Sequence, residues 1–274
     1  MKRFLAAIRF LTIIPVPGTW GAEEDSLARS VIFFPLVGLL LGVICGAIAF
    51  GLSFVVGGVV GPAVVVIVLL VFSGGLHMDG LSDTADGFFS ARPRERILEI
   101  MKDSHIGAMG VMAIVCVLLL KFAALAEVAG RPVATNLASG PWATLTDPAR
   151  WFSDHSIRFW KAALLMPLAG RAAIVIQMVL LPYAKPEGLG KVFCRNRPIM
   201  SAGLAVLLLA GIGFLLVGLA GVVMAGALVA VASLFAGYCH RKIGGATGDT
   251  FGAACEIGEL ATAVMLAVWL AVAA

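Results

Sequence analysis

Long apolar runs are the feature that most restricts how this chain can fold. They are Val31–Phe50, Val59–Phe72, Ile106–Ala126, Ala162–Leu181, Ser201–Leu219 and Val222–Ala236. Most of them approach the roughly 20 residues that a helix needs to cross about 30 Å of hydrocarbon. With 61% apolar and only 13% charged residues, the chain is too apolar for an ordinary soluble domain. Because backbone groups in lipid must bond within their own segment, the runs predict helices.

We therefore predict an all-α fold, a polytopic membrane helix bundle that forms a single integral-membrane domain over 1–274. The bundle should have about seven transmembrane helices, at 31–53, 59–77, 106–129, 162–182, 200–218, 219–238 and 259–274. Lys and Arg are concentrated in the connections on one side, which the positive-inside rule assigns to the cytoplasm. The N-terminus is then cytoplasmic, with 1–30 an interfacial segment and 130–161 a long periplasmic connection.

An acidic motif follows the second expected span. Residues 77–90 read HMDGLSDTADGFFS, and in a helix Asp79, Asp83 and Asp86 share one face within roughly 60°. The dipole of a helix N-terminus would favour one or two of them. Three carboxylates on one face repel one another unless a cation neutralises them, and Mg²⁺ prefers oxygen ligands. The motif therefore predicts a metal site made by these three residues.

A second acidic motif precedes the last expected span. Residues 244–260 read GGATGDTFGAACEIGEL, in which Asp249 and Glu256 share a helical face and Glu259 lies about 60° away. Gly244 and Gly245 suit a close approach of the backbone to a phosphate. Both motifs have a Gly-Gly pair, an acid four residues later and another seven further on. We expect them to line one cytoplasmic cavity, with Asp249, Glu256 and Glu259 as further metal ligands or as the catalytic base.

Candidate substrate contacts come from scattered basic residues. Lys102 and Lys185 either bind phosphate or anchor the chain at the membrane surface. His77 is a candidate substrate-binding residue or general base. Arg171 lies inside an apolar run, where an arginine faces the protein interior or a wet cavity, so it reaches the substrate or pairs with a buried acid. No basic cluster with interleaved aromatic residues is present, which argues against nucleic-acid binding.

These motifs, with RERILEIMKDSHIGAMG at 94–110 and YAKPEGLG at 183–190 between them, resemble the cobalamin synthase family in their order along the chain. The family usually has Leu and Ala where Met78 and Ser82 stand here, and every carboxylate is kept. The resemblance implies a Mg²⁺-dependent phosphotransferase that joins adenosylcobinamide-GDP to α-ribazole or its 5′-phosphate, with release of GMP. It implies a multi-pass protein of the bacterial inner membrane with its active site facing the cytoplasm. The expected partners are these substrates and the lipid bilayer, with a homo-oligomer or other cobalamin-assembly enzymes as further candidates.

Two other functions use the same acidic residues. A CDP-alcohol-type phosphotransferase would make a lipid with the same metal chemistry, but the full signature of that family is absent. A cation-coupled transporter would place its acids near the middle of the membrane, often in inverted repeats. Here the acids gather toward one predicted face and the weak repeat is not inverted, which favours an enzyme.

Overall fold

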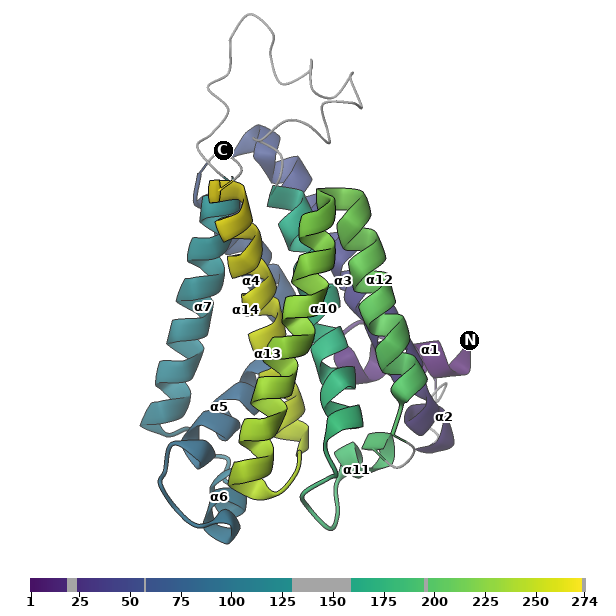
Figure 1. Ribbon diagram of the computed structural model, residues 1–274, viewed down its shortest axis with the longest axis vertical. Coiled ribbons are helices and arrows are strands. Elements are labelled where there is room, and N and C mark those ends of the chain that lie inside the picture. The colour runs from purple at the N-terminus through teal and green to yellow at the C-terminus, as the bar shows by residue number, and fades with distance from the viewer. Residues whose placement is uncertain (19–23, 57, 130–158, 195–196, 273–274) are drawn as a thin grey trace, which may run out of the picture.

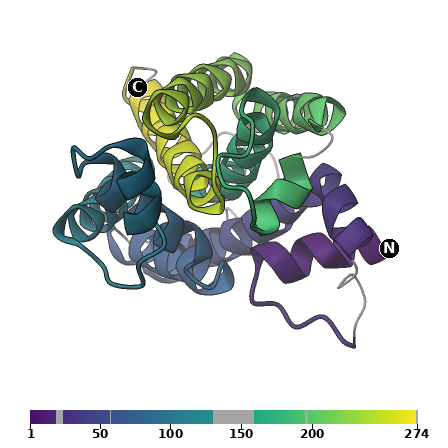
Figure 2. The same ribbon diagram turned by 90° about the horizontal axis from the view of Figure 1, so that it is seen from below.

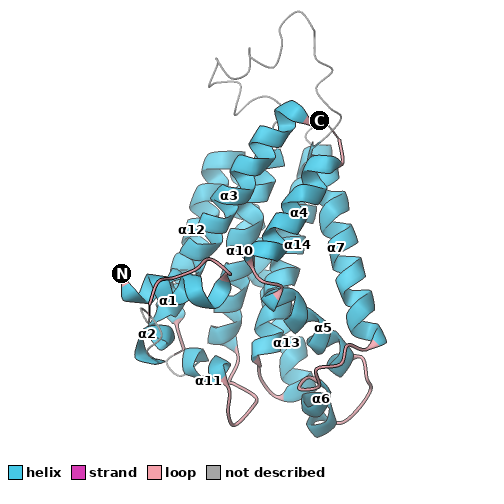
Figure 3. Cartoon of the chain, turned by 180° about the vertical axis from the view of Figure 1, so that it is seen from behind, coloured by secondary structure: helices cyan, strands magenta, loops and turns pink. Residues whose placement is uncertain are grey.

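The computed structural model describes residues 1–18, 24–56, 58–129, 159–194 and 197–272, and the regular structure in these ranges is helical (Figures 1 and 3). Within these ranges, six helices are long and apolar enough to cross a membrane. A seventh crossing is formed if the bent pair α4–α5 counts as one span. The elements are α1 (Lys2–Leu11), α2 (Glu24–Ala28), η1 (Arg29–Phe33), α3 (Phe34–Val55), α4 (Val60–Phe72), α5 (Leu76–Phe88), α6 (Arg94–Ile100), α7 (Ala108–Ala129), α10 (Phe159–Leu180), α11 (Leu189–Cys194), α12 (Ile199–Val217), α13 (Leu219–Ile243) and α14 (Gly248–Val272). The prediction of an all-α membrane bundle is confirmed.

The centre of the bundle is α10, which is buried over nearly its whole length and packs on α3, α12, α13 and α14. A row of glycines at Gly38, Gly42 and Gly46 lets α3 approach the backbone of α10. A Cβ at Gly38 would lie 2.7 Å from the carbonyl oxygen of Pro167, and one at Gly42 would collide with that of Leu164. Glycines four residues apart are a common device for close helix packing in lipid, where apolar surface alone gives little driving force.

The second predicted span, 59–77, is broken. Helix α4 ends at Phe72, and the chain passes through Gly74 and Gly75, both in the left-handed region at φ 62° and 72°. Helix α5 then leaves at 88° to α4. Glycine tolerates this conformation without a Cβ clash, which makes the sharp turn possible. The turn directs the acidic motif of α5 toward the end of the bundle that also carries α6 and α11 (Figure 1).

The last predicted span, 259–274, starts too late, and the connection from the preceding span is shorter than the predicted spans at 219–238 and 259–274 imply. Helix α13 continues to Ile243 and α14 begins at Gly248, so only a short connection separates them. Asp249, Glu256 and Glu259 are therefore helical residues. The tight turn between α12 and α13 lies at Gly218, where φ is 65°. The connection predicted at 130–161 lies outside the described residues up to 158.

The N-terminal segment packs against the bundle at the end where α5, α6 and α11 also lie (Figure 2). Helix α1 buries Ala6, Ala7 and Leu11 and lies across the direction of the long helices. The ring of Phe10 stacks on that of Phe34 of α3, with 5.9 Å between ring centroids. It also contacts the ring of Phe193 of α11, with 4.9 Å between centroids. The orientation predicted for this segment, on the cytoplasmic side, stays a prediction.

The contact of α3 with α10 gives a stability prediction. Gly42→Ala should lower the melting temperature of the purified protein in detergent, because overpacking at a well-packed site costs about 1–3 kcal/mol. Gly51→Ala, in the same helix with open space around it, should leave the melting temperature unchanged or raise it, since alanine favours a helix by about 0.5–1 kcal/mol. Equal melting temperatures for the two variants would contradict the glycine contact.

Candidate active site

The two acidic motifs meet where α5 crosses α14. A Cβ on Gly80 would lie 2.6 Å from the carbonyl oxygen of Asp249, and one on Gly252 would lie 3.0 Å from the carbonyl oxygen of His77. Only helices that touch backbone to backbone produce such distances. The structure therefore brings together the two motifs that the sequence separates by more than half of its length.

Four carboxylates surround this crossing. Asp79 is exposed, and Asp83, Asp86 and Asp249 are half-buried. The negative charges of Asp79, Asp249 and Asp86 repel the carboxylate of Asp83, and the positive charge of Lys185 attracts it. The side-chain carboxylates of Asp79 and Asp83 accept no hydrogen bond within the described ranges. Their repulsion is the electrostatic feature that a bound cation or a basic side chain would relieve.

Asp249 is held at the start of α14. Its Oδ2 accepts a hydrogen bond from Thr247 Oγ1 at 3.2 Å and lies 3.1 Å from Lys185 Nζ. The lysine is placed by its loop, because Ala184 N donates to Ala246 O at 2.7 Å and Ala246 N donates to Pro182 O at 2.8 Å. This short parallel pairing fixes Lys185 beside Asp249.

Gly244 and Gly245, which were predicted to approach a phosphate, are needed for the conformation and packing of the connection between α13 and α14. Gly245 packs against the carbonyl of Pro182, and a side chain there would collide with it. Gly244 ends α13 at φ 75°, in the left-handed conformation typical of a helix C-terminus. The guanidinium of Arg94 donates to Ile243 O at 2.7 Å and to Ala184 O at 3.2 Å, so α6 ties the two loops together.

Asp86 faces the beginning of α7. Its Oδ2 accepts a hydrogen bond from Gly107 N at 2.7 Å and its Oδ1 accepts one from Gly110 N at 2.8 Å. The carboxylate therefore already has partners on both oxygens, unlike those of Asp79 and Asp83.

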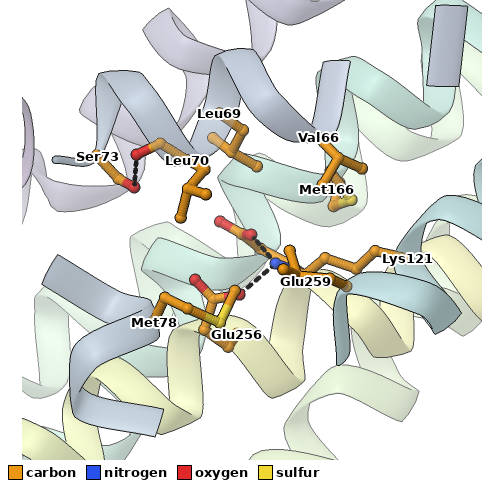
Figure 4. Close-up of a pocket in the computed structure, with 10 residues that line it drawn as sticks. Val66, Leu69, Leu70, Ser73, Met78, Lys121, Met166, Glu256 and Glu259 are labelled. Atoms are coloured by element: carbon orange, nitrogen blue, oxygen red, sulfur yellow. Dashed lines mark hydrogen bonds and ion pairs between the residues drawn. The ribbon is translucent and has the colours of Figure 1, made fainter. Parts of the chain in front are cut away.

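A second charged group lies deeper in the bundle and joins three helices; Figure 4 shows its members Lys121, Glu256 and Glu259. Lys121 of α7 forms ion pairs with Glu256 and, at 2.5 Å, with Glu259, both of α14. Arg171 of α10 pairs with Glu259. All four residues are at most 4% exposed. Two cations face two anions, so the buried charges balance.

This arrangement settles the partner of Arg171 and locates His77. Of the two readings from the sequence, Arg171 pairs with a buried acid. His77 is 2% exposed, with its Nδ1 3.5 Å from the guanidinium of Arg171 and its Nε2 without a partner in the described structure. The role predicted for His77 in substrate binding or as a base stays a prediction. Lys102 lies apart from both groups, exposed on the segment between α6 and α7.

A narrow crevice reaches the deeper charges. Its volume accessible to a water-sized sphere is about 10 Å³, and α4, α5, α7, α10 and α14 line it. Figure 4 shows Val66, Leu69 and Met166 on its apolar walls, with Lys121 and the two glutamates beside them.

The residues present do not form a ready-made metal site. Within the described ranges no group of three or more His, Cys, Asp or Glu side chains is placed to hold an ion. The reason is that Asp86 and Asp249 are turned toward other partners, which leaves Asp79 and Asp83. The predicted trio of Asp79, Asp83 and Asp86 remains a prediction.

Comparison with known proteins identifies the family. The model of the family described as cobalamin-5-phosphate synthase matches residues 3–267. The chain belongs to this family. An adenosylcobinamide-GDP ribazoletransferase of Roseiflexus sp. is 38% identical over 93% of this chain and 85% of its own length. Proteins of the same name from Citrobacter koseri and Geotalea daltonii are 36% and 33% identical, over 94% and 95% of this chain and 96% and 94% of theirs. No solved structure matches the chain.

Sequence reasoning on this family member missed Lys121 and Arg94. Lys121 carried a signal, because a lysine inside an apolar span is costly and normally has a buried partner. Its partners could not be named without knowing how α7 packs on α14. Arg94 carried no such signal, since it is one of several arginines in a polar connection.

The buried ion pairs give a double-mutant prediction. Lys121→Met should destabilise the protein strongly, by about 3–5 kcal/mol, because it leaves a buried carboxylate without its partner. Adding Glu256→Gln should recover part of the loss, since one Arg171–Glu259 pair then remains. Melting temperatures in detergent measure both effects, with exposed Lys102→Met as the control. Additive losses in the double variant would contradict the coupling.

Proposed function

We propose that this protein joins adenosylcobinamide-GDP to α-ribazole or to α-ribazole 5′-phosphate. The products are adenosylcobalamin or its 5′-phosphate, together with GMP. The observation that carries this proposal is family membership over nearly the whole chain, with relatives named for that transfer at 33–38% identity. The crossing of α5 and α14 supports it, because a reaction of phosphates needs an organised charged site, and this crossing provides one.

The chemistry is a displacement at phosphorus. A hydroxyl of the ribazole attacks the phosphorus attached to cobinamide, and a new P–O bond forms. The bond from that phosphorus to the bridging oxygen breaks, and GMP leaves with the electron pair. The hydroxyl proton passes to a base or to water. Such transfer depends on positioning and charge neutralisation more than on covalent participation by the protein.

The residues at the crossing would divide this work. Lys185 is the basic side chain next to the carboxylates and would contact a substrate phosphate. Asp249, held by Thr247, would orient Lys185 or accept the hydroxyl proton. Asp79 and Asp83 keep free carboxylates at the accessible end of the site. Glu256 and Glu259 could serve as bases only if their ion pairs with Lys121 and Arg171 opened.

We further propose that the reaction requires Mg²⁺ and takes place at the cytoplasmic face of a bacterial inner membrane. A divalent cation would neutralise charge on the diphosphate. Asp79 and Asp83 would hold it together with substrate oxygens, since Mg²⁺ usually takes only one or two protein carboxylates. No step is assigned to the ion, because the described residues do not form a complete site for it.

The decisive test is product formation by the purified protein in liposomes. With adenosylcobinamide-GDP, α-ribazole 5′-phosphate and Mg²⁺, cobalamin 5′-phosphate and GMP should appear in equal amounts, and EDTA should stop the reaction. Asp83→Asn should lower the rate by about a hundredfold or more, the loss typical of removing one preorganised charged group at a reacting centre. Glu99→Gln removes the same charge from an exposed pair with Arg96 and should have little effect.

Each outcome of that test decides a different point. No product from folded protein would refute the transfer and direct attention to nucleotide-activated lipids. Product from an undiminished Asp83→Asn variant would keep the function and refute the role of the acidic helix. Product in EDTA would refute the magnesium requirement alone.

Lys185 offers a separate kinetic prediction. Lys185→Met should raise KM for adenosylcobinamide-GDP by about tenfold, as expected when a charged hydrogen bond to phosphate is lost. Lys191→Met is the matched control, because Lys191 lies in the same region and its Nζ donates to the backbone oxygen of Pro186. A KM that stays the same in both variants would rule out Lys185 as a phosphate contact.

A further inference from the structure

The start of α7 lacks the side chains that usually cap a helix. Gly107 occupies the N-cap position, because its carbonyl accepts the first helical hydrogen bond from Val111 N at 3.1 Å. Gly110 is the third helical residue. In the common capping box, the side chain of a Ser or Thr at the N-cap accepts from the N–H of the third helical residue. The side chain of a Glu at that third position accepts from the N–H of the N-cap residue. Two glycines can supply neither side chain.

Asp86 of α5 supplies both of the missing acceptors. Its two carboxylate oxygens take the N–H groups of Gly107 and Gly110, at 2.7 and 2.8 Å. These are the two groups that a capping box would satisfy from within the helix. The negative charge also lies at the positive end of the α7 dipole, where it is favoured.

The glycines are required by this arrangement. A Cβ on Gly110 would lie 2.5 Å from Asp86 Oδ2 and a Cβ on Gly107 would collide with Asp86 Oδ1. The same carboxylate could not approach α7 if either residue had a side chain. The GAMG sequence at 107–110 is therefore complementary to an aspartate on a neighbouring helix.

We propose that Asp86 is a positioning residue, which caps α7 from α5 and is not one of the carboxylates that would hold a metal ion. It fixes segment 101–110 against the acidic helix. Asp86 thereby acts through the placement of α5, which carries Asp79 and Asp83. The side-chain carboxylates of Asp79 and Asp83 accept no hydrogen bond in the described structure and remain available for a cation. The kinetic part of this inference rests on the proposed function, whereas the structural part does not.

Hydrogen–deuterium exchange tests the cap directly. In the full-length protein in detergent, Asp86→Ala should speed exchange of the Gly107 and Gly110 amides by about tenfold or more, because a charged acceptor is lost from both. Asp83→Asn is the control and should leave these amides protected. Should Asp86→Ala fail to fold, Gly110→Ala keeps the carboxylate but displaces it, and should expose the same amides. Unchanged exchange in the folded variants would overturn the cap.

Binding of Mn²⁺ tests whether Asp86 is a metal ligand. It is followed by electron paramagnetic resonance, with GDP present as the diphosphate probe. Asp86→Ala should keep the Kd for Mn²⁺ within about threefold, whereas Asp83→Asn should raise it by about tenfold or more. An equal rise in both variants would make Asp86 a ligand and overturn the assignment. If Asp83→Asn does not change the Kd, the metal proposal for Asp83 fails, and the exchange result on Asp86 stands.

Steady-state kinetics distinguish positioning from a general loss of structure. Asp86→Ala should raise KM for adenosylcobinamide-GDP by about tenfold while kcat changes by less than about threefold. A loss confined to kcat would refute the positioning role of Asp86.

Discussion

The balanced group of Lys121, Arg171, Glu256 and Glu259 is the interaction on which the arrangement of the bundle depends. Apolar side chains gain little by leaving lipid for one another, so close packing and polar contacts must select how membrane helices associate. These four side chains join α7, α10 and α14 at a single level. An unpaired charge there would be costly, which makes any other register of the three helices unfavourable. The lower half of α14, with Asp249 near its start, is thereby fixed relative to α7.

Glycine contacts complete what the ion pairs begin. Gly170 lets α10 approach α14, because a Cβ at this position would lie 2.6 Å from Glu259 and 2.8 Å from Cys255. The neighbouring Arg171 then reaches Glu259. Nearer the start of α14, Gly252 contacts Gly80, and this contact packs α5 against α14. Small residues and buried charges thus act together: the first allow backbones to touch, and the second determine which turns of the helices face each other.

The sequence predicted the class of fold because apolar runs of spanning length allow few other structures. It did not predict the break at Gly74–Gly75, since glycine is common within membrane helices and only its left-handed conformation here reveals a turn. The early start of α14 was missed for a related reason. The spacing placed Asp249 and Glu256 on one helical face, but ahead of the last apolar span, because acidic residues are costly inside a span. Lys185 and Lys121 pair with them, so one continuous helix can include them. Partners of this kind depend on tertiary register, which a single sequence does not display.

The candidate site shows the same division between what a pattern can and cannot reveal. The acidic motifs are visible in the sequence, and their spacing places the carboxylates of α5 on one face. Which carboxylates are free is decided by neighbours far along the chain. Asp86 meets the two amides of α7, Asp249 meets Lys185, and Glu256 and Glu259 meet buried cations. A carboxylate whose charge is already balanced contributes to folding. One whose charge is not balanced is stable only where solvent, an ion or a substrate can reach it. Asp79 and Asp83 meet that condition at the accessible end of the bundle, which is consistent with the role proposed for them.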